Sequence, residues 1–238
     1  VFLLKVLQLG YTDEDFMVAI KSVEKIAFRW AICKENAQQL ETKLQNLAHE
    51  LLPNNVENLK QVCLKMIMEA PGDEAFSAAF IAGTSRDTRM QAYVMRSLCY
   101  GITGSDVTTS RYEVSVEHIA PQNPLPESST YWYEKIAPLE AVADGSNYED
   151  FVYRWGNITI LEKKLNSSVG QNEWMIKREG KPGAEATPKF KGYRASNIEV
   201  TKHLLDLDAW SAELINKRSE WIASQSLLYW KRELPKSG

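Results

Sequence analysis

The feature that most constrains the fold of this chain is an apolar stripe of helical period that recurs through its first hundred residues. Thr12 and an acidic turn at 13–15 suit the N-cap and the positive end of a helix dipole. Apolar side chains then recur three and four positions apart, at Phe16, Ile20, Val23, Ala27 and Trp30. The same pattern covers Leu40, Leu44, Leu47 and Leu51, and then Leu59, Val62, Met66 and Ile67. Breaks at Asn54-Asn55 and Pro71-Gly72-Asp73 separate these helices, and two more are predicted over 74–82 and 87–100, the second ending at Gly101.

Beyond Gly101 the pattern becomes typical of β-strands. Residues 111–119 alternate, with Tyr112, Val114 and Val116 on one face, and prolines from 121 onward end the run. A second β-like run occupies 156–161. Between the two runs lies a long acidic insertion, in which short helices are predicted around 128–137 and 147–153.

The rest of the chain returns to helix. We expect Asn166 in a polar turn or short helix, a helix near 171–179 and a loop over 180–195 that is rich in Gly, Pro and Lys. Ser196 is predicted to cap a helix to about 207, and Asp208 a last long helix to about 232. The expected fold class is mainly α, a bundle-like helical body around one small β element. The expected divisions are a helical region over 1–105, the β element and its insertion over 106–195, and helices over 196–238 that pack on the body.

Composition narrows the class of protein. Apolar residues make up 44% of the chain and aromatic residues 10%, which excludes a disordered protein and supplies a sizeable core. No apolar run approaches the roughly 20 residues that span a bilayer, so we expect a soluble protein without a membrane partner. Cys33, Cys63 and Cys99 are far apart and form no CxxC pair, which favours free thiols in a reducing, cytoplasmic compartment. The apolar start has neither Met nor a basic n-region, which favours a fragment of a longer chain over a signal-peptide remnant.

Charge is distributed unevenly along the chain. The formal net charge of −3 by itself argues weakly against nucleic acid. Acidic residues nevertheless dominate 101–162, and basic residues dominate 163–202. This order suits a metal site beside a phosphate-binding surface, although two differently solvated faces would also produce it.

The three histidines differ in their surroundings. His49 and His203 lie in helical stretches with no carboxylate or second histidine at metal-ligand spacing, so structural or surface roles are expected. His118 ends the first predicted strand, directly after Glu117 and before Ile-Ala-Pro-Gln. Adjacent strand residues point to opposite faces unless the strand end twists, so this dipeptide alone does not separate a catalytic pair from a structural histidine.

Later residues complete a motif around His118. Glu117-His118-Ile-x-Pro-Gln is followed by Gly156-Asn157-Ile-x-Ile-Leu, and Asn166 lies nine residues after Asn157. This order and spacing resemble the HNH motif of ββα-metal (His-Me finger) nucleases. In that motif an acidic residue and His end the first strand, an Asn-hydrophobic-x-hydrophobic run opens the second part, and a His or Asn follows nine residues on. The resemblance implies a helical body with an embedded small ββα-metal motif.

The chain is similar in particular to the C-terminal domain of GmrSD-type modification-dependent restriction enzymes, a domain type shared with SspE-like phage-defence proteins. In that branch, helices with a patterned Arg precede the motif, as in Phe28-Arg29-Trp30 and Tyr93-Val94-Met95-Arg96. An aromatic residue and Lys follow the last Asn, here Trp174 and Lys177. Trp210, Ile215 and Arg218 match the closing Trp-x3–4-Ile-x2-Arg tail. The similarity covers most of the chain and is most specific over 113–177.

The resemblance implies a role for each residue of the motif. The Glu117 carboxylate and the Asn166 side-chain carbonyl would be oxygen ligands of a divalent metal, Mg²⁺ or Mn²⁺. His118 would act as the catalytic base toward water, and Asn157 would hold the loop that orients it. The basic side chains expected to bind DNA phosphates are Lys163, Lys164, Lys177 and Arg178.

These roles predict a metal-dependent endonuclease (a phosphodiester hydrolase) that nicks or cleaves double-stranded DNA, modified or not. It would be the C-terminal effector part of a restriction or phage-defence protein. The resemblance implies a partner within the same protein, the N-terminal sensing or nucleotide-hydrolysing domain of such proteins. That domain is not expected in this sequence, because no GxxxxGK[ST] string occurs here.

Two departures from the motif leave alternatives open. The acidic ligand is Glu rather than the commoner Asp, and 38 residues separate His118 from Asn157. The insertion carries Tyr131, Trp132 and Tyr133, which would either stack on a base or pack the insertion onto the helical body. The alternative functions are a catalytically degenerate DNA-binding or interaction module and an RNA-cleaving HNH domain. A strand turn with a satisfied core histidine is the structural alternative.

Overall fold

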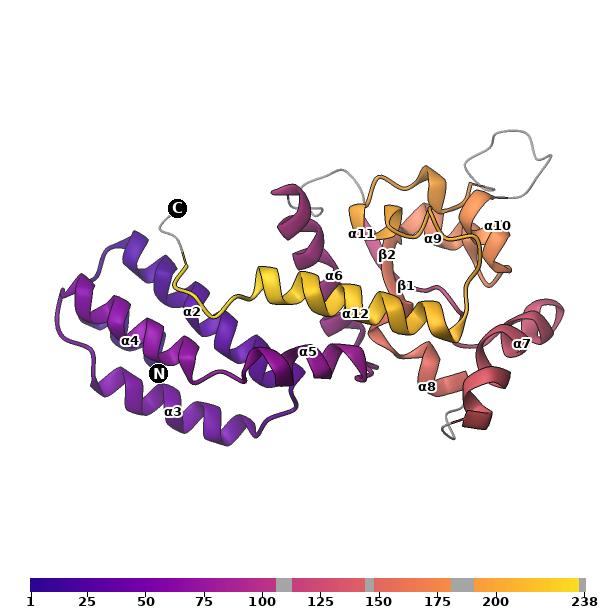
Figure 1. Ribbon diagram of the computed structural model, residues 1–238. Helices are drawn as coiled ribbons and strands as arrows, with labels where there is room; N and C mark the ends of the chain where they lie inside the picture. Colours follow the sequence, from indigo (N-terminus) through magenta and orange to yellow (C-terminus); the bar gives the residue numbers. More distant parts are fainter. Residues whose placement is uncertain (106–112, 144–147, 181–190, 236–238) are drawn as a thin grey trace. The chain divides into compact units, whose positions relative to one another are not determined.

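The structure is a computed structural model, and it describes residues 1–105, 113–143, 148–180 and 191–235. Helix predominates, and the described part contains a small two-stranded antiparallel sheet, which confirms the predicted fold class (Figure 1). The chain divides into two compact units. The N-terminal unit comprises Val1–Ala79 together with Trp230–Gly238, and the hairpin unit comprises Phe80–Tyr229. Across the described ranges, no helix combines the length and the hydropathy that crossing a membrane requires.

The N-terminal unit contains the predicted amphipathic helices, preceded by a short helix that was not among them. Its first four are α1 (Phe2–Gln8), α2 (Asp13–Ile32), α3 (Ala37–His49) and α4 (Val56–Met68). The predicted cap at Thr12 is confirmed, because the Thr12 hydroxyl accepts a hydrogen bond from the Asp15 N–H and the Asp15 carboxylate accepts one from the Thr12 N–H. The apolar stripes meet in one core, which includes Ile26, Trp30, Leu47, Leu59, Val62 and Met66.

The last described residues belong to the N-terminal unit. Trp230 is fully buried and stacks on Phe28, with ring centroids 3.8 Å apart. The buried Arg29 guanidinium donates to the Trp230 carbonyl at 2.9 Å and pairs with Asp73 at 2.6 Å. The prediction of a helix to about 232 was therefore too long. Helix α12 (Ala212–Tyr229) ends one residue before Trp230, where the backbone turns into this core.

Helices α5 (Asp73–Ile81) and α6 (Thr88–Thr103) lie where two helices were predicted. Gly101 does not end α6. The helix continues to Thr103 and stops at Gly104, whose φ of 69° is the left-handed conformation of a helix C-cap. The sequence-based boundary at 105 does not coincide with a unit boundary, because α6 belongs to the hairpin unit and packs against both strands there.

The sheet of the hairpin unit pairs two segments that are far apart in the sequence. Strand β1 (Val114–His118) runs antiparallel to β2 (Ile158–Glu162), in a register that opposes Val114 to Glu162 and His118 to Ile158. The first strand is shorter than the predicted run over 111–119, and Tyr112 lies outside the described residues. A short 3-10 turn, η1 (Trp155–Asn157), leads into β2.

The outer edge of β2 is closed by side chains. The Thr201 hydroxyl donates to the Ile160 carbonyl at 2.7 Å. The fully buried Arg218 guanidinium donates to the Gly156 and Ile158 carbonyls, both at 2.6 Å. These bonds satisfy carbonyls that an edge strand would otherwise leave unpaired, which explains how so small a sheet remains stable inside a helical body.

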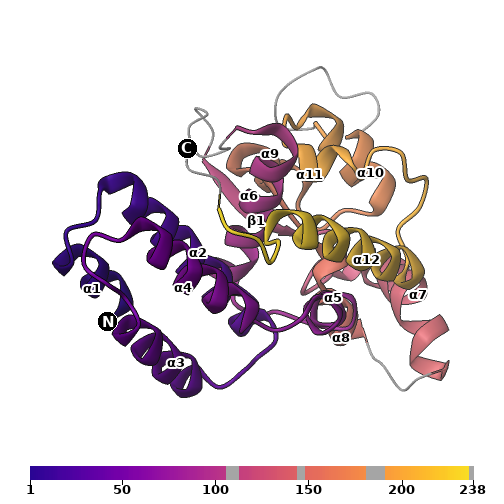
Figure 2. The same cartoon turned by 60° about the vertical axis from the view of Figure 1, so that its left-hand side comes forward.

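Gly156 is needed where α12 crosses η1. A Cβ at Gly156 would lie 1.8 Å from the Ile215 carbonyl oxygen, so any larger residue would push the two segments apart. Helix α12 also runs beside α6 in both views of the molecule (Figures 1 and 2). The C-terminal helix thereby holds the start of β2 and the back of α6 in one unit.

The remaining helices surround the sheet and differ in part from their predicted bounds. They are α7 (Pro126–Ala143), α8 (Tyr148–Val152), α9 (Lys163–Val169), α10 (Trp174–Glu179) and α11 (Glu199–Lys202), with a 3-10 turn η3 at Tyr193–Ala195. Asn166 lies in a short helix, α9, as expected. The predicted helix from Ser196 to about 207 is wrong, since only four residues are helical and the Ser196 hydroxyl accepts from the Ile198 N–H instead. The cap of α12 is Ser211 rather than Asp208, since the Ser211 hydroxyl accepts from the Leu214 N–H. Most of the predicted loop over 180–195 lies outside the described residues.

Candidate active site

Glu117 and His118 are the last two residues of β1, opposite Thr159 and Ile158 of β2. The chain is held immediately after them, because the Ile119 N–H donates to the Asn157 carbonyl at 3.0 Å. The start of β2 therefore anchors the turn that carries the predicted catalytic dipeptide.

The His118 imidazole is half-buried, and its Nε2 atom is buried with no hydrogen-bond partner among the described residues. The ring packs against Tyr153 in a T-shaped arrangement, with centroids 5.8 Å apart. Burial, together with the nearby Lys177 ammonium, lowers the pKa of His118 from 6.5 to about 4. The ring is therefore neutral at pH 7, which is the protonation state that a general base requires.

Asn157 is fully buried and acts as a clamp on the backbone after His118. Its Oδ1 accepts from the Ala120 N–H at 2.8 Å and from the Trp210 indole N–H at 3.1 Å. Its Nδ2 donates to the carbonyls of Ala120 and Val152, both at 2.9 Å. The whole amide is occupied by these bonds, so Asn157 holds the turn after His118, which is the role that the resemblance implies for it.

Glu117 lies in a buried polar cluster with Lys177 and Tyr193. The Lys177 ammonium, which is fully buried, donates to Glu117 Oε1 at 2.7 Å and to the His118 carbonyl at 3.1 Å. The Tyr193 hydroxyl donates to the same carboxylate oxygen at 2.9 Å. Burial raises the pKa of Glu117, and Lys177 and Tyr193 oppose that rise. Burial likewise lowers the pKa of Lys177, which the Glu117 carboxylate opposes.

This geometry differs from the expected contact of Lys177 with DNA phosphate. The side chain points into the unit and neutralises a buried carboxylate, because an ammonium that loses its water needs a charged partner. Lys177 also joins the two residues of the dipeptide, since its ammonium binds the Glu117 side chain and the His118 backbone.

The oxygen donors expected for a metal are Glu117 and Asn166. Lys177 and Tyr193 both bind Oε1 of Glu117, which leaves Oε2 as the candidate metal donor of this carboxylate. The Asn166 Nδ2 donates to Ser115 Oγ at 2.8 Å and to the Val116 carbonyl at 2.9 Å, which leaves Oδ1 as the candidate metal donor of this amide. A carboxylate oxygen and an amide oxygen are hard donors of the kind that Mg²⁺ and Mn²⁺ accept, so the donor set fits such an ion. The described residues include no cluster of three His, Cys, Asp or Glu.

The other expected phosphate contacts lie at the edge of the hairpin unit. Lys163 and Lys164 are exposed at the start of α9, where Lys163 pairs with Glu113 at 2.8 Å. Arg178 is largely buried, and its guanidinium donates to the carboxylates of Glu179 and Asp208. Lys163 and Lys164 are therefore the exposed members of the four predicted side chains, and Arg178 is held by acidic neighbours.

The aromatic residues of the insertion divide between the two expectations. Trp132 is fully buried, and its indole N–H donates to the Gln171 carbonyl at 3.4 Å, so it packs the insertion onto the unit. Tyr133 is 47% exposed and lies edge-on to Tyr148. The packing interpretation therefore holds for Trp132.

Two residues around the site were not found from the sequence. Tyr193 binds Glu117 across 76 positions, and Tyr153 contacts His118 from the end of the insertion. The Arg86 guanidinium lies 4.1 Å from the centroid of the Tyr153 ring. No spacing pattern marks these residues, since each reaches the site only through the tertiary fold.

Comparison with known families agrees with this geometry. The family model of the C-terminal domain of GmrSD restriction endonucleases matches residues 70–225, a range that includes both strands, α9, α10 and most of α12. No curated protein matches the chain. The family match covers more than half of the chain and includes Glu117, His118, Asn157 and Asn166 in the arrangement described above. The chain therefore belongs to the family of GmrSD restriction endonuclease C-terminal domains.

Proposed function

We propose that this chain is a divalent-metal-dependent DNA endonuclease in which His118 is the general base. The observation that carries the proposal is the buried Nε2 of a neutral imidazole, which has no hydrogen-bond partner in the part of the chain that the structure describes and is located at the strand end that also bears Glu117. Membership of a restriction endonuclease family supports DNA as the substrate. The double-stranded form of that DNA, modified or not, is part of the proposal.

In the proposed reaction, water attacks a DNA phosphorus while His118 Nε2 takes a proton from that water. A new P–O bond forms and the bond to the 3′ oxygen breaks. The products are a 5′-phosphate and a 3′-hydroxyl, whose oxygen takes its proton from solvent. Asn157 contributes by holding Ala120, and hence the position of the imidazole, through both ends of its amide.

Glu117 and Asn166 are the residues that would hold a Mg²⁺ or Mn²⁺ ion. Such an ion, when bound, supplies stabilisation of the negative charge on the phosphate and the leaving oxygen. Lys177 and Tyr193 orient the Glu117 carboxylate by occupying one of its oxygens. Lys163 and Lys164 are proposed to contact flanking phosphates from α9, and Arg178 to assist from α10.

The biological setting is also part of the proposal. We infer that the chain is the effector part of a modification-dependent restriction or phage-defence protein in the cytoplasm, working with a sensing domain of the same protein. The family description supports this setting, because it names restriction endonucleases.

The test is relaxation of a supercoiled plasmid with Mg²⁺ or Mn²⁺. His118→Ala is compared with the wild type, with an EDTA control, and with His49→Ala, which alters an exposed histidine of the N-terminal unit. Nicking that is lost with EDTA and in His118→Ala, but retained in His49→Ala, is the expected result. Activity that survives in His118→Ala would overturn the proposal. A labelled RNA substrate in the same assay separates DNA from RNA cleavage.

A further inference from the structure

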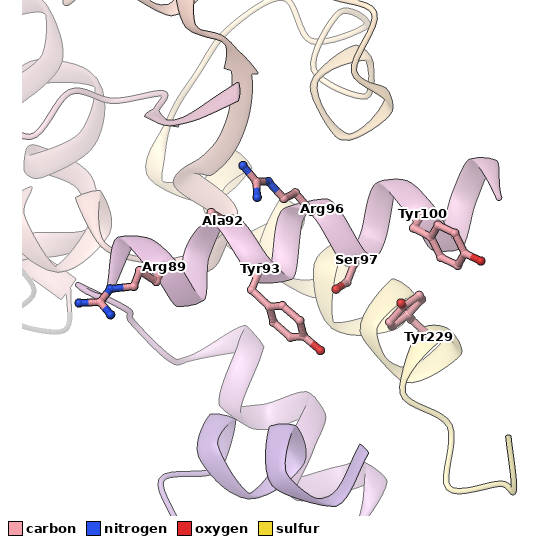
Figure 3. A pocket seen from close by; sticks show the side chains of 7 residues that line it. All are labelled: Arg89, Ala92, Tyr93, Arg96, Ser97, Tyr100 and Tyr229. Atoms are coloured by element: carbon pink, nitrogen blue, oxygen red, sulfur yellow. The ribbon is translucent and has the colours of Figure 1, made fainter. Parts of the chain in front are cut away.

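Helix α6 carries an arginine and tyrosine face on the side opposite its buried residues. The buried residues of α6 are Gln91, Val94, Met95, Ser97, Leu98 and Cys99, and Ser97 lies at the border of the two sides. The opposite side lines a hollow of about 540 Å³, within the range of small-molecule sites of about 300–1,000 Å³. Its lining residues are Arg89, Ala92, Tyr93, Arg96, Ser97 and Tyr100 from α6 and Tyr229 from α12 (Figure 3).

The hollow is positively charged. Arg89 and Arg96 lie two turns apart along α6, and no acidic residue is among the lining residues. Neither arginine forms an ion pair within the described part of the chain, and Nε of Arg96 is buried without a hydrogen-bond partner there. A guanidinium that is partly desolvated and has no carboxylate partner is suited to bind an anion.

The same face presents aromatic rings. Tyr93 is 39% exposed and Tyr100 is 49% exposed, and both project from α6. Tyr229 lies edge-on to Tyr100, with ring centroids 6.3 Å apart and an interplanar angle of 90°. Gly101 makes room for Tyr229, because a Cβ at Gly101 would lie 2.9 Å from Tyr229 Cδ2. The aromatic wall therefore depends on a specific close approach of α12 to α6.

We propose that this hollow is a second nucleic-acid contact of the hairpin unit and that it takes an unpaired nucleotide of a DNA strand. The base would stack on the Tyr93 or Tyr100 ring, and the flanking phosphates would bind Arg89 and Arg96. This inference rests on the proposed DNA substrate and adds a preference for DNA that carries a single-stranded segment. Charge complementarity selects the occupant, since a strand supplies phosphates on both sides of a stackable base.

Binding is measured by fluorescence anisotropy in EDTA, in a His118→Ala background. Since nothing is cleaved, the result does not depend on the catalytic proposal. The probes are a blunt duplex and the same duplex with a single-stranded overhang. The His118→Ala parent, in which the hollow is unaltered, should bind the overhang duplex more tightly than the blunt duplex. Tyr100→Ala should weaken overhang binding by about tenfold, whereas Tyr100→Phe, which keeps the ring face, should bind normally.

Charge is tested separately. Arg89→Gln and Arg96→Gln should each reduce the salt dependence of overhang binding, by about 0.7 in the slope of log K against log salt. Two controls alter exposed residues of the same unit outside the hollow. Lys217→Gln removes a charge on α12 that is paired with Glu213, and Leu125→Ala removes an exposed apolar side chain. Both should bind like the His118→Ala parent.

Three outcomes would overturn the inference. One is overhang binding that is unchanged in the Arg96→Gln/Tyr100→Ala double variant, with a normal circular dichroism spectrum. Another is an equal loss of blunt and overhang binding, which would indicate only general electrostatic attraction. The third is a free deoxynucleotide that binds the hollow as tightly as the strand does, which would make the occupant a mononucleotide. Failure of plasmid nicking with this overhang preference intact would instead count against the catalytic proposal alone.

Discussion

The Lys177 ammonium lies 2.7 Å from Glu117 Oε1 in a site where both side chains are buried. The pair joins α10 to the end of β1, next to the histidine on which the proposed chemistry depends. Desolvation opposes both charges, so the pair is stable only as long as both partners are present.

Replacing Lys177 should therefore destabilise the hairpin unit strongly. Lys177→Met leaves the Glu117 carboxylate buried without its counter-charge, and we expect a loss of about 3–5 kcal/mol in the free energy of unfolding. Adding Glu117→Gln should restore more than half of that loss, because the buried charge is then removed. Urea unfolding followed by circular dichroism measures both changes. As a control, Lys163→Met breaks the exposed pair with Glu113 and should leave the midpoint nearly unchanged. Equal effects of the two lysine variants would contradict the assignment.

Stability should fall in mild acid because of His118. The folded state holds the pKa of His118 at about 4, below the ordinary value of 6.5. Between these two values the unfolded chain binds a proton that the folded chain does not, so the free energy of unfolding decreases as the pH falls from 6.5 toward 4. The urea midpoint of His118→Gln should decline less over this range than that of the wild type. His203, whose pKa burial also lowers, contributes the same decline to both proteins. If the urea midpoints of wild type and variant decline in parallel with falling pH, the pKa of His118 is not lowered in the folded state.

The same shift sets the acid limit of catalysis. A general base with a pKa near 4 stays unprotonated through pH 5, so kcat/KM for nicking should hold its value well below pH 6.5. The profile is measured between pH 5 and 8 at a constant free Mn²⁺ concentration. An acid limb centred at the ordinary histidine value of about 6.5 would place the base in a more exposed setting than this one.

Asn157 is expected to matter for both stability and activity. Asn157→Ala would leave the Ala120 N–H and carbonyl buried without the hydrogen bonds that Asn157 makes to them. Each unsatisfied buried group costs about 1–3 kcal/mol. We expect a loss of at least about 3 kcal/mol, together with reduced nicking at temperatures where the variant is still folded. Asn172→Ala is the matched control, since the Asn172 amide donates to the Val169 carbonyl in a local turn. Full activity in folded Asn157→Ala would remove its positioning role.

Metal binding provides a test that does not depend on cleavage. Calorimetric titration with Mn²⁺ should detect a site in the wild type, and Asn166→Ala should weaken it on the order of tenfold or more, because changes even to groups that only orient a metal ligand cost about 10–100-fold. Ser115→Ala removes the hydrogen bond to the Asn166 amide nitrogen but keeps the Oδ1 oxygen, so it should retain most of the affinity. If both variants bind Mn²⁺ like the wild type, Asn166 is not a ligand.

Several features of this protein were determined by the sequence alone, because local physics decides them. The apolar stripes, the Thr12 capping box and the mainly helical class follow from the period of the side chains and from backbone groups within a few residues. The family was also recognisable from Glu117-His118, Asn157 and Asn166, since a motif keeps its internal spacing even when an insertion of 38 residues divides it.

Helix ends were less predictable, since distant contacts decide them. Gly101 has the sequence signature of a helix end, yet it lies inside α6, where the missing side chain admits Tyr229. The last helix was predicted to continue through Trp230, but that indole is buried against Phe28 in the other unit. In both cases a residue more than a hundred positions away competes with the local signal.

The partners of the site residues were decided only by the tertiary structure. Lys177 follows the motif as an ordinary basic residue, and charge alone suggested a phosphate contact. Its burial beside Glu117 and Tyr193 depends on how α10 and η3 pack against β1, across separations of 60 and 76 residues. Sequence spacing records which residues are present and in what order, whereas the desolvation that forces a lysine to pair with a carboxylate exists only once the chain has closed around them.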